Sequence, residues 1–331
     1  MPRPFELPPA LRGDAFSRAD ALRRGLDDNR LRRSDLAAPF TGIRVVSADR
    51  PTGIRSLCEA YAPRLRPGQY FSHRTAALLW ELPSAVRRSA AHVLDVSVTA
   101  EAGWPPTARG VRGHVLAVAP RVVELRGLPV CDAASVWIQL GSVAGVDELV
   151  AVGDAAVYRS RFARADDPRP FTTIAELSER LTHFRGRGKR RLESALALVR
   201  EGVESPMETA LRLLLVRGGL PEPEINVDLY TGSGEFAGRA DLYYREFNVV
   251  VEYDGEQHRL DRAVYASDQR RITRLLDLNA VVRVRVEGLR SEAHLTLAEV
   301  RAALTAAGWR PIDSVISVCS AGARRQKSPS R

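Results

Sequence analysis

The strongest constraint on the fold is the segment 248–254, with the sequence NVVVEYD. Its three successive valines (249–251) are typical of a strand that is buried on both faces. Glu252 and Asp254 follow, and residues two apart in a strand point to the same face. Because a carboxylate is costly to bury, two acids at the end of such a strand indicate a site rather than a packing position.

The sequence on either side predicts an α/β domain with the element order αβββαβα. The first helix has Ser205 as N-cap, Pro206 in the first turn and Glu208 three residues after the cap, which is a capping-box start. A glycine-containing turn at 231–235 joins the first two strands. We expect strands at Glu224–Tyr230, Phe236–Tyr244, Asn248–Asp254 and Ala280–Val286, and helices at about 260–278 and 291–307.

A third acid, Asp241, lies eleven residues before Glu252 on the preceding strand. If the chain turns at 245–247, Asp241 pairs near Glu252 and shares a face with it. Like charges that converge in a buried place need a cation, and oxygen-only ligands favour Mg²⁺ or Mn²⁺. Such a metal would serve phosphodiester cleavage. The alternative is an acidic surface hairpin paired with nearby arginines, but the flanking valines make these poor surface strands.

These residues resemble the PD-(D/E)XK endonuclease superfamily. The pattern Asp241-x(10)-Glu252-x-Asp254-Gly255-x-x-His258, preceded by the helix with Glu208, is similar to the Vsr-like (very-short-patch-repair-like) domains of unknown function. The stretches SPMETALRLLLVRGGLPEPEIN and VVVEYDGEQH carry the likeness, over about residues 204–290.

The resemblance implies that Asp241 and Glu252 hold the metal, that Glu208 assists from the helix, and that DNA is hydrolysed. Asp254 stands where the superfamily more often has lysine, so the ammonium that would orient the water is missing. By this analogy Gln257 or His258 fills that role. His258 has an equal alternative as a residue that only positions others through hydrogen bonds.

The first 50 residues predict a winged-helix-like DNA-binding region. Ser17 is a plausible N-cap for a helix at 18–24, and a second, basic helix is expected at about 28–36 before a strand at 40–46. The second helix would enter the major groove with its arginines, Arg30, Arg32 and Arg33. The alternative is a small helical subdomain with a solvated arginine face.

Residues 51–157 predict a mixed α/β middle domain, with a helix at 70–82 and strands at 92–99, 113–118 and 122–125. The histidines of this domain share no ligand spacing and are interpreted as structural: His73, His92 and His114. The N-terminal part also resembles, more loosely, the AbiEi-type antitoxins of abortive-infection systems. That resemblance implies a DNA-binding autorepressor and a possible protein partner of toxin–antitoxin type.

The remaining segments are a basic linker with helices at 158–203, the nuclease-like domain at 204–312 and a disordered basic tail at 313–331. The linker carries 11 basic against 5 acidic residues over 158–200. Its run GRGKRR (186–191) is expected to be loosened by its glycines and to contact phosphates. The residues expected to do so are Arg187, Lys189, Arg190 and Arg191.

The whole chain of 331 residues has a net charge of +9 and a pI of about 10.0, which favours a polyanionic partner, nucleic acid before membrane. The alternative is that codon bias alone makes the chain rich in arginine. No run of 18 apolar residues predicts a transmembrane helix, and no signal peptide is evident. Three dispersed cysteines fit a reducing cytoplasm.

The sequence therefore predicts a multi-domain α/β protein that uses Mg²⁺ or Mn²⁺ to hydrolyse DNA. A regulator of the antitoxin-like class, whose nuclease fold only binds, is the first alternative. An RNA-directed nuclease is the second, because nothing in the acidic pattern separates DNA from RNA.

Overall fold

The chain divides into two compact units, and the computed structural model describes most of each. The first unit is Met1–Leu213 and the second is Leu214–Arg331. The described residues are 6–13, 15–83, 93–161, 167, 169–255, 274–276 and 279–311. Both units mix helices with sheets, which confirms the α/β class; the finer five-part division stays a prediction. The expected tail at 313–331 lies outside the described residues.

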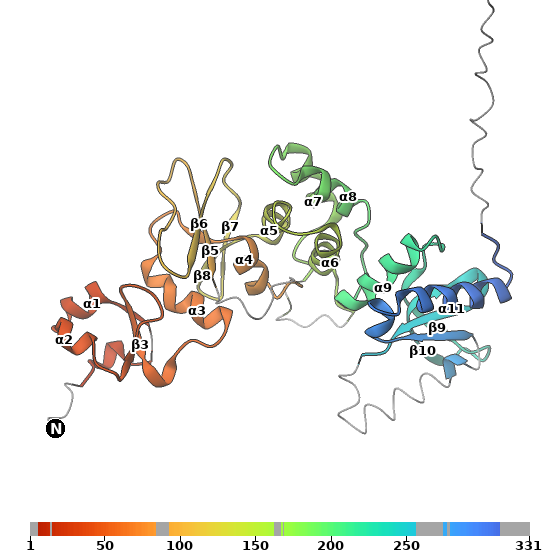
Figure 1. Ribbon diagram of the computed structural model, residues 1–331, viewed down its shortest axis with the longest axis horizontal. Coiled ribbons are helices and arrows are strands. Elements are labelled where there is room, and N and C mark those ends of the chain that lie inside the picture. The colour runs from red at the N-terminus through yellow and green to blue at the C-terminus, as the bar shows by residue number, and fades with distance from the viewer. Residues whose placement is uncertain are drawn as a thin grey trace, which may run out of the picture. The chain divides into compact units, whose positions relative to one another are not determined.

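The N-terminal part of the first unit is a small three-stranded antiparallel sheet with two short helices. In chain order these are β1 (Phe16–Ser17), α1 (Arg18–Arg23), α2 (Asp28–Leu31), β2 (Leu36–Ala37) and β3 (Ile43–Val46), and the strand order is β1-β3-β2 (Figure 1). Ser17 caps α1 as predicted, because its hydroxyl accepts from Asp20 N at 3.0 Å. The predicted length of the second helix is wrong: α2 has four residues, since the chain enters β2 at Leu36.

A five-stranded mixed sheet follows, with the strand order β6-β5-β4-β8-β7. Its strands are β4 (Tyr70–Phe71), β5 (Leu94–Thr99), β6 (Val111–Leu116), β7 (Val122–Leu125) and β8 (Leu128–Cys131). The helix expected to begin at residue 70 is wrong at its start, because Tyr70 and Phe71 pair with β5 and α4 spans only His73–Leu79. Pairing with a distant strand overrides the local helical pattern here.

Helices pack beside this sheet and share its core (Figure 1). They are α3 (Ile54–Tyr61), α5 (Ala133–Leu140), α6 (Val146–Val157), α7 (Ile174–His183) and α8 (Lys189–Leu196). The segment expected to be a linker thus contributes two packed helices, which bury Leu177 and Leu192 completely. The expectation of a loosened run at 186–191 is wrong at Gly188: a Cβ there would lie 1.9 Å from the Gly141 carbonyl oxygen, so the glycine permits close packing.

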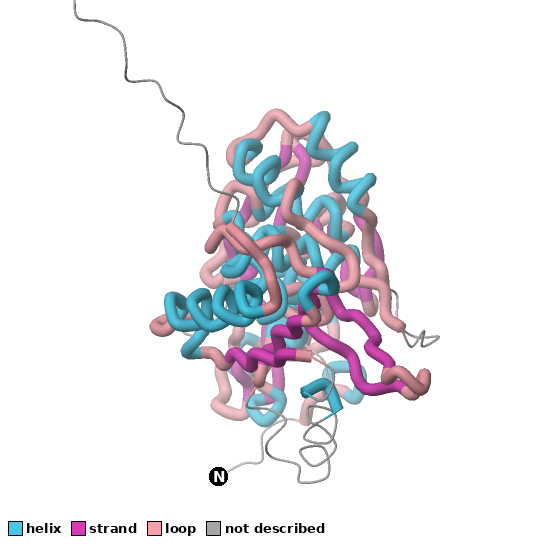
Figure 2. Tube along the Cα trace, turned by 90° about the vertical axis from the view of Figure 1, so that its right-hand side faces the viewer, coloured by secondary structure: helices cyan, strands magenta, loops and turns pink. Residues whose placement is uncertain are grey.

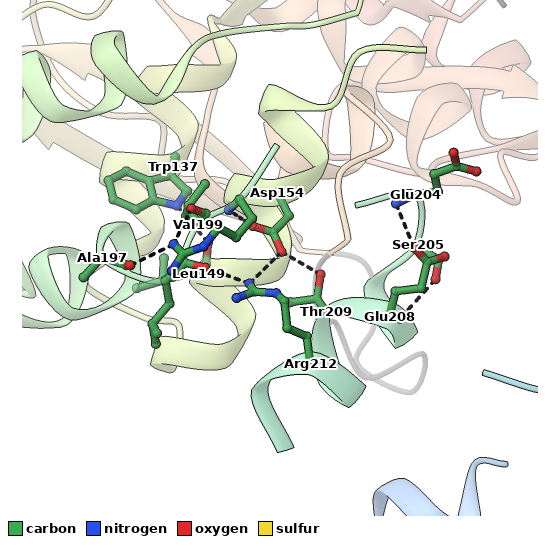
Figure 3. Close-up of polar contacts among 12 residues, drawn as sticks. Trp137, Leu149, Asp154, Ala197, Val199, Glu204, Ser205, Glu208, Thr209 and Arg212 are labelled. Atoms are coloured by element: carbon green, nitrogen blue, oxygen red, sulfur yellow. Dashed lines mark hydrogen bonds and ion pairs between the residues drawn. The ribbon is translucent and has the colours of Figure 1, made fainter. Parts of the chain in front are cut away.

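A buried ion pair joins α6 to the start of α9 (Pro206–Arg217) within the first unit (Figure 3). Asp154 is 1% exposed and accepts from Arg200 N at 2.8 Å and Thr209 Oγ1 at 2.9 Å. Arg212, which is fully buried, donates to the same carboxylate at 3.4 Å and to Leu198 O at 2.7 Å. Burial, more than these donors, sets the pKa of Asp154 and raises it.

The second unit is built on a four-stranded sheet in the order β12-β11-β10-β9. Figure 1 labels two of its strands, and Figure 2 draws the strands in magenta. Its strands are β9 (Glu224–Tyr230), β10 (Phe236–Tyr244), β11 (Val249–Tyr253) and β12 (Ala280–Val284). The first three are antiparallel neighbours, and β11 and β12 are parallel. These strands confirm the sequence prediction to within two residues at each end.

Helix α11 (Ala293–Ala306) packs against β11 and β12. The close fit depends on Gly288, where a Cβ would lie 2.6 Å from Thr296 Oγ1 and 2.9 Å from a Val284 methyl group. Thr296 also donates to the Gly288 carbonyl at 2.8 Å. The tight approach anchors the helix beside the carboxyl end of β12. In the part of the chain that the structure describes, no helix is long and apolar enough to cross a membrane.

Candidate functional site

The candidate site begins where the ladder between β10 and β11 stops. The last paired residues are Leu242 and Val251. The same register places Asp241 opposite Glu252, as the sequence predicted, and the strands are joined at the predicted turn, Arg245–Phe247, which is a single 3-10 turn. Directly opposite residues in an antiparallel pair share a face, so the two carboxylates point to the same side of the sheet.

Each of these carboxylates bonds to the backbone of the opposite strand. Asp241 Oδ2 accepts from Tyr253 N at 2.8 Å, and Glu252 Oε1 accepts from Asp241 N at 3.3 Å. Side-chain oxygens thus take over donors where the backbone pairing ends. Glu252 is only 2% exposed and Asp241 is half-buried. The arrangement brings two acids together at an interruption of a buried sheet.

Two arginines complete this end of the sheet: Arg283 of β12 and Arg285, the residue directly after this strand. Arg283 is the direct parallel partner of Glu252. Asp254, just beyond β11, donates its backbone N–H to Val284 O at 2.8 Å. Its Oδ2 accepts from Arg283 at 3.3 Å and from Arg285 Nε at 3.4 Å. Sequence reasoning missed both arginines, although their alternation with valines in AVVRVRV places them on one face.

A polar row therefore crosses the sheet, one residue from each strand. The register of β9 with β10 places Asn226 opposite Asp241, and Asn226 is buried with a positive φ of 51°. Asparagine is one of the few residues that adopt this conformation readily. The polar row consists of Asn226, Asp241, Glu252 and Arg283.

The donor set of the polar row suits a hard cation bound by few protein ligands. Among the described residues, no group of three or more His, Cys, Asp or Glu side chains is gathered as a metal set. Mg²⁺, however, keeps several waters and is commonly bound by one or two carboxylates together with substrate phosphate. A carboxylate oxygen that accepts one hydrogen bond retains lone pairs for a cation. Asp241 and Glu252 thus fit as a two-carboxylate Mg²⁺ or Mn²⁺ site.

The third predicted acid, Glu208, belongs to the first unit. It is 8% exposed, its N–H donates to Ser205 Oγ at 3.2 Å, and its Oε2 accepts from Glu204 N at 3.0 Å (Figure 3). These bonds give the helix the capped start that the sequence predicted. A role for Glu208 beside Asp241 and Glu252 stays a prediction.

Two further predicted catalytic residues, Gln257 and His258, lie outside the described residues, as does most of the helix expected at about 260–278. Their roles stay predictions. Asp254, also predicted to be catalytic, lies beside Glu252 on the same face as expected, and it forms ion pairs with Arg283 of β12 and with Arg285 directly after that strand.

The arginines predicted to enter a DNA groove differ in their surroundings. Arg30 is 7% exposed and donates twice to the Asp35 carboxylate, at 3.0 and 2.8 Å. Arg32 and Arg33 are exposed. Arg30 thus holds the loop before β2, and the two exposed arginines are the better candidates for phosphate contacts.

The predicted basic run at 186–191 also divides into two kinds of residue. Arg191 donates to Ala144 O at 2.8 Å and to Ser142 O at 3.5 Å, so it anchors the loop between α5 and α6. Arg187 and Arg190 are exposed, and Lys189 is half-buried at the start of α8. Contact with phosphates stays a prediction for this run.

A second polar cluster lies inside the first unit, and sequence spacing did not reveal it. The rings of His73 and His114 stack with their centroids 3.9 Å apart. His114 Nε2 lies 2.8 Å from Asp95 Oδ1, and His73 Nδ1 lies 3.1 Å from Ser72 Oγ. Burial lowers the pKa of His73 to about 4, and the neighbouring His114 adds to that shift. His92 lies outside the described residues.

The cluster is closed in by its own hydrogen bonds, which fits the structural interpretation of these histidines. Ser97 Oγ donates to Ser72 Oγ at 2.6 Å, and both serines are fully buried. The backbone N–H of His73 donates to Gln139 Oε1 at 2.8 Å. A substrate has no access to such hydroxyls, so we place the candidate active site in the second unit. No protein-family model matches this chain, and no curated protein matches it either.

Proposed function

We propose that the second unit hydrolyses phosphodiester bonds of DNA with a divalent cation held by Asp241 and Glu252. One observation carries the proposal. The backbone pairing between β10 and β11 stops after Leu242 and Val251. At that point the carboxylates of Asp241 and Glu252 each accept a hydrogen bond from a backbone N–H of the opposite strand. Buried charges are paired or coordinate metals, so two acids that meet at this point support a bound cation.

The proposed reaction needs water as its only co-reactant. A bond forms between the water oxygen and phosphorus, one P–O ester bond breaks, and the leaving oxygen takes up a proton. A bound Mg²⁺ supplies an activated water and stabilises the charge that develops on the phosphate. Asp241 and Glu252, both in the second unit, would hold this cation.

The first unit supports DNA as the substrate. Its β1-α1-α2-β2-β3 order and its β1-β3-β2 sheet fit a winged-helix interpretation. Arg32, Arg33, Arg187 and Arg190 are exposed cations in a chain of net charge +9, which suits a polyanion. Cys58 and Cys131 are buried free thiols, which fits the proposed cytoplasmic location.

A regulatory protein of antitoxin-like type is the second candidate. Asp254 favours it, because an acid stands where the resembled nucleases more often have lysine. In that case the second unit binds DNA without cutting it, and the first unit provides the operator contacts and a surface for a toxin partner.

Cleavage of supercoiled plasmid with and without Mg²⁺ tests the proposal. Glu252→Gln removes one negative charge at nearly constant shape, and we expect cleavage to fall at least about 100-fold because several kcal/mol of charge stabilisation are lost. Glu224→Gln is the matched control, since Glu224 pairs with exposed Arg245 in the same sheet. It should cleave as the wild type does.

The outcomes separate the candidates. Wild-type protein that binds the plasmid but leaves it intact with both Mg²⁺ and Mn²⁺ contradicts the hydrolytic proposal and supports the regulator. A labelled RNA of matching sequence, run in parallel, distinguishes a DNA nuclease from an RNA nuclease.

A further inference from the structure

Asp254 holds two guanidinium groups with a single carboxylate oxygen. Arg283 approaches Asp254 Oδ2 to 3.3 Å and Arg285 to 3.4 Å. The Asp254 side chain is 10% exposed, whereas the two arginines are 32% and 61% exposed. The acid is therefore the inner member of the cluster, and the cations are its outer members.

The three residues share a face with the proposed metal ligands. Arg283 is the parallel partner of Glu252, and Arg285 and Asp254 each lie two residues further along their chains. Because residues two apart point the same way, all four side chains gather at the carboxyl end of the β11–β12 pair. Two arginines against one aspartate give this group of three residues one net positive charge beside the Asp241–Glu252 pair.

The position of Asp254 makes this charge significant. The resembled nucleases more often have lysine there, and this chain has an acid instead. A cation is nevertheless present at the same end of the sheet, carried by the neighbouring strand. Arginine presents planar, forked donors that suit the oxygens of a phosphate.

We propose that Asp254 is a positioning residue that anchors Arg283 and Arg285, and that these two arginines bind the phosphate that is cleaved. The inference rests on the proposed hydrolysis and names the groups that recognise its substrate. Asp254 is then neither a metal ligand nor a base. It holds the two outer guanidinium groups in place before the substrate arrives, which lowers the entropic cost of binding.

The direction of approach follows from the charges around this corner. A hollow of about 560 Å³ lies on one side of the arginines and is lined also by Glu287, Glu292 and Glu299. These acids repel a polyanion. The phosphate is therefore placed on the Glu252 side of the arginines, where a divalent cation would also attract it.

The test compares full-length variants in single-turnover cleavage with Mg²⁺. Arg283→Gln and Arg285→Gln should each lower the rate about 100-fold, as expected for loss of one charge-stabilising donor. Asp254→Asn should lower it similarly, and Asp254→Asn combined with Arg283→Gln should cost no more than the worse single change, because the two act as one unit. Arg285→Lys, which keeps the charge without the fork, should be intermediate.

Arg245→Gln is the matched control, since Arg245 is an exposed, ion-paired arginine of the same sheet at the turn after β10. It should cleave as the wild type does. Melting temperatures of the variants provide a second control: a purely structural ion pair would lower the melting temperature and leave the cleavage rate unchanged. That result overturns the inference.

Binding provides a readout that does not depend on cleavage. In the Glu252→Gln background, each arginine change should flatten the plot of log binding constant against log salt by about 0.9, the loss of one phosphate contact. Unchanged slopes overturn the inference even if hydrolysis is confirmed. If the slopes flatten but the wild-type protein does not cleave, the phosphate contacts are supported and the proposed hydrolysis is wrong. If Asp254→Asn abolishes cleavage and neither arginine change lowers it, Asp254 itself acts in the reaction. That result also overturns the inference.

Discussion

Among the described residues, the most deeply buried carboxylate of the first unit is Asp154, at 1% exposure, and that of the second unit is Glu252, at 2%. Asp154 sits among helices, and its donors are the backbone N–H of Arg200 in the segment after α8, a threonine and a buried arginine (Figure 3). Glu252 sits where two strands stop pairing, opposite another acid. Two equally buried carboxylates can therefore have different roles. The acid at a candidate site is the one that lies where regular strand pairing stops.

The comparison predicts its largest effect for Asp154→Ala. The change leaves the fully buried Arg212 guanidinium without this carboxylate, and loss of one partner of a buried pair costs about 3–5 kcal/mol of unfolding free energy. Urea unfolding followed by the fluorescence of the buried Trp137 measures the first unit. The matched control is Glu81→Ala, because Glu81 and Arg126 form an exposed pair whose loss should cost under about 1 kcal/mol.

A result for Asp154→Ala no larger than that of the control would contradict the structural interpretation of Asp154. Asp154→Ala combined with Arg212→Met sharpens the test. The double change should recover stability relative to Asp154→Ala, since replacing both members of a buried pair by apolar groups is often tolerated.

The next effect concerns pH and the stacked histidines of the first unit. The folded pKa of His73 is about 4, below its ordinary 6.5, so the unfolded chain binds a proton first as the pH falls. The contribution of His73 to the free energy of unfolding is therefore complete above about pH 6.5. It is lost as the pH falls towards 4, and the loss is about 3 kcal/mol in all. The charged and titratable groups that face His73 are His114, Asp95 and Arg112.

His73→Asn tests this, because asparagine tolerates the positive φ of 47° at this position and does not titrate. Between pH 6.5 and 4 the variant should lose less stability than the wild type, by about 3 kcal/mol. His183→Asn, at an exposed position near the end of α7, should retain the wild-type slope. Equal slopes for all three proteins would mean that His73 is not held neutral by the fold.

The smallest effect is stabilisation of the second unit by metal. Mg²⁺ that binds only the folded state should add up to about 2.7 kcal/mol at 100 times its dissociation constant. Hydrogen exchange of the backbone amides of β10 and β11 reports the unfolding of this unit. Glu252→Gln should lose most of the gain, whereas Glu224→Gln should retain it. If the wild type gains nothing, the interrupted strand pair is no metal site, and the regulatory function becomes the leading hypothesis.

Much of the second unit could be predicted from local pattern. Valine runs, a glycine-containing turn and the short connection at Arg245–Phe247 specify neighbouring antiparallel strands, so the register that sets Asp241 opposite Glu252 follows from the turn. The same reasoning failed at Tyr70 and Phe71, which look helical by local pattern and are drawn into a strand by distant partners.

The sequence by itself determined the order of the described elements of the second unit, the capped start of α9 and the facing pair of acids, because each depends on residues close together in the chain. Only the tertiary structure decided which arginines form ion pairs with Asp254, which arginines hold parts of the fold together, and that the rings of His73 and His114 stack. The contacts of Asp254 and the stack of His73 with His114 join segments that are far apart in the chain. Local periodicity carries no information about such pairing, since loop closure costs little more for one distant partner than for another.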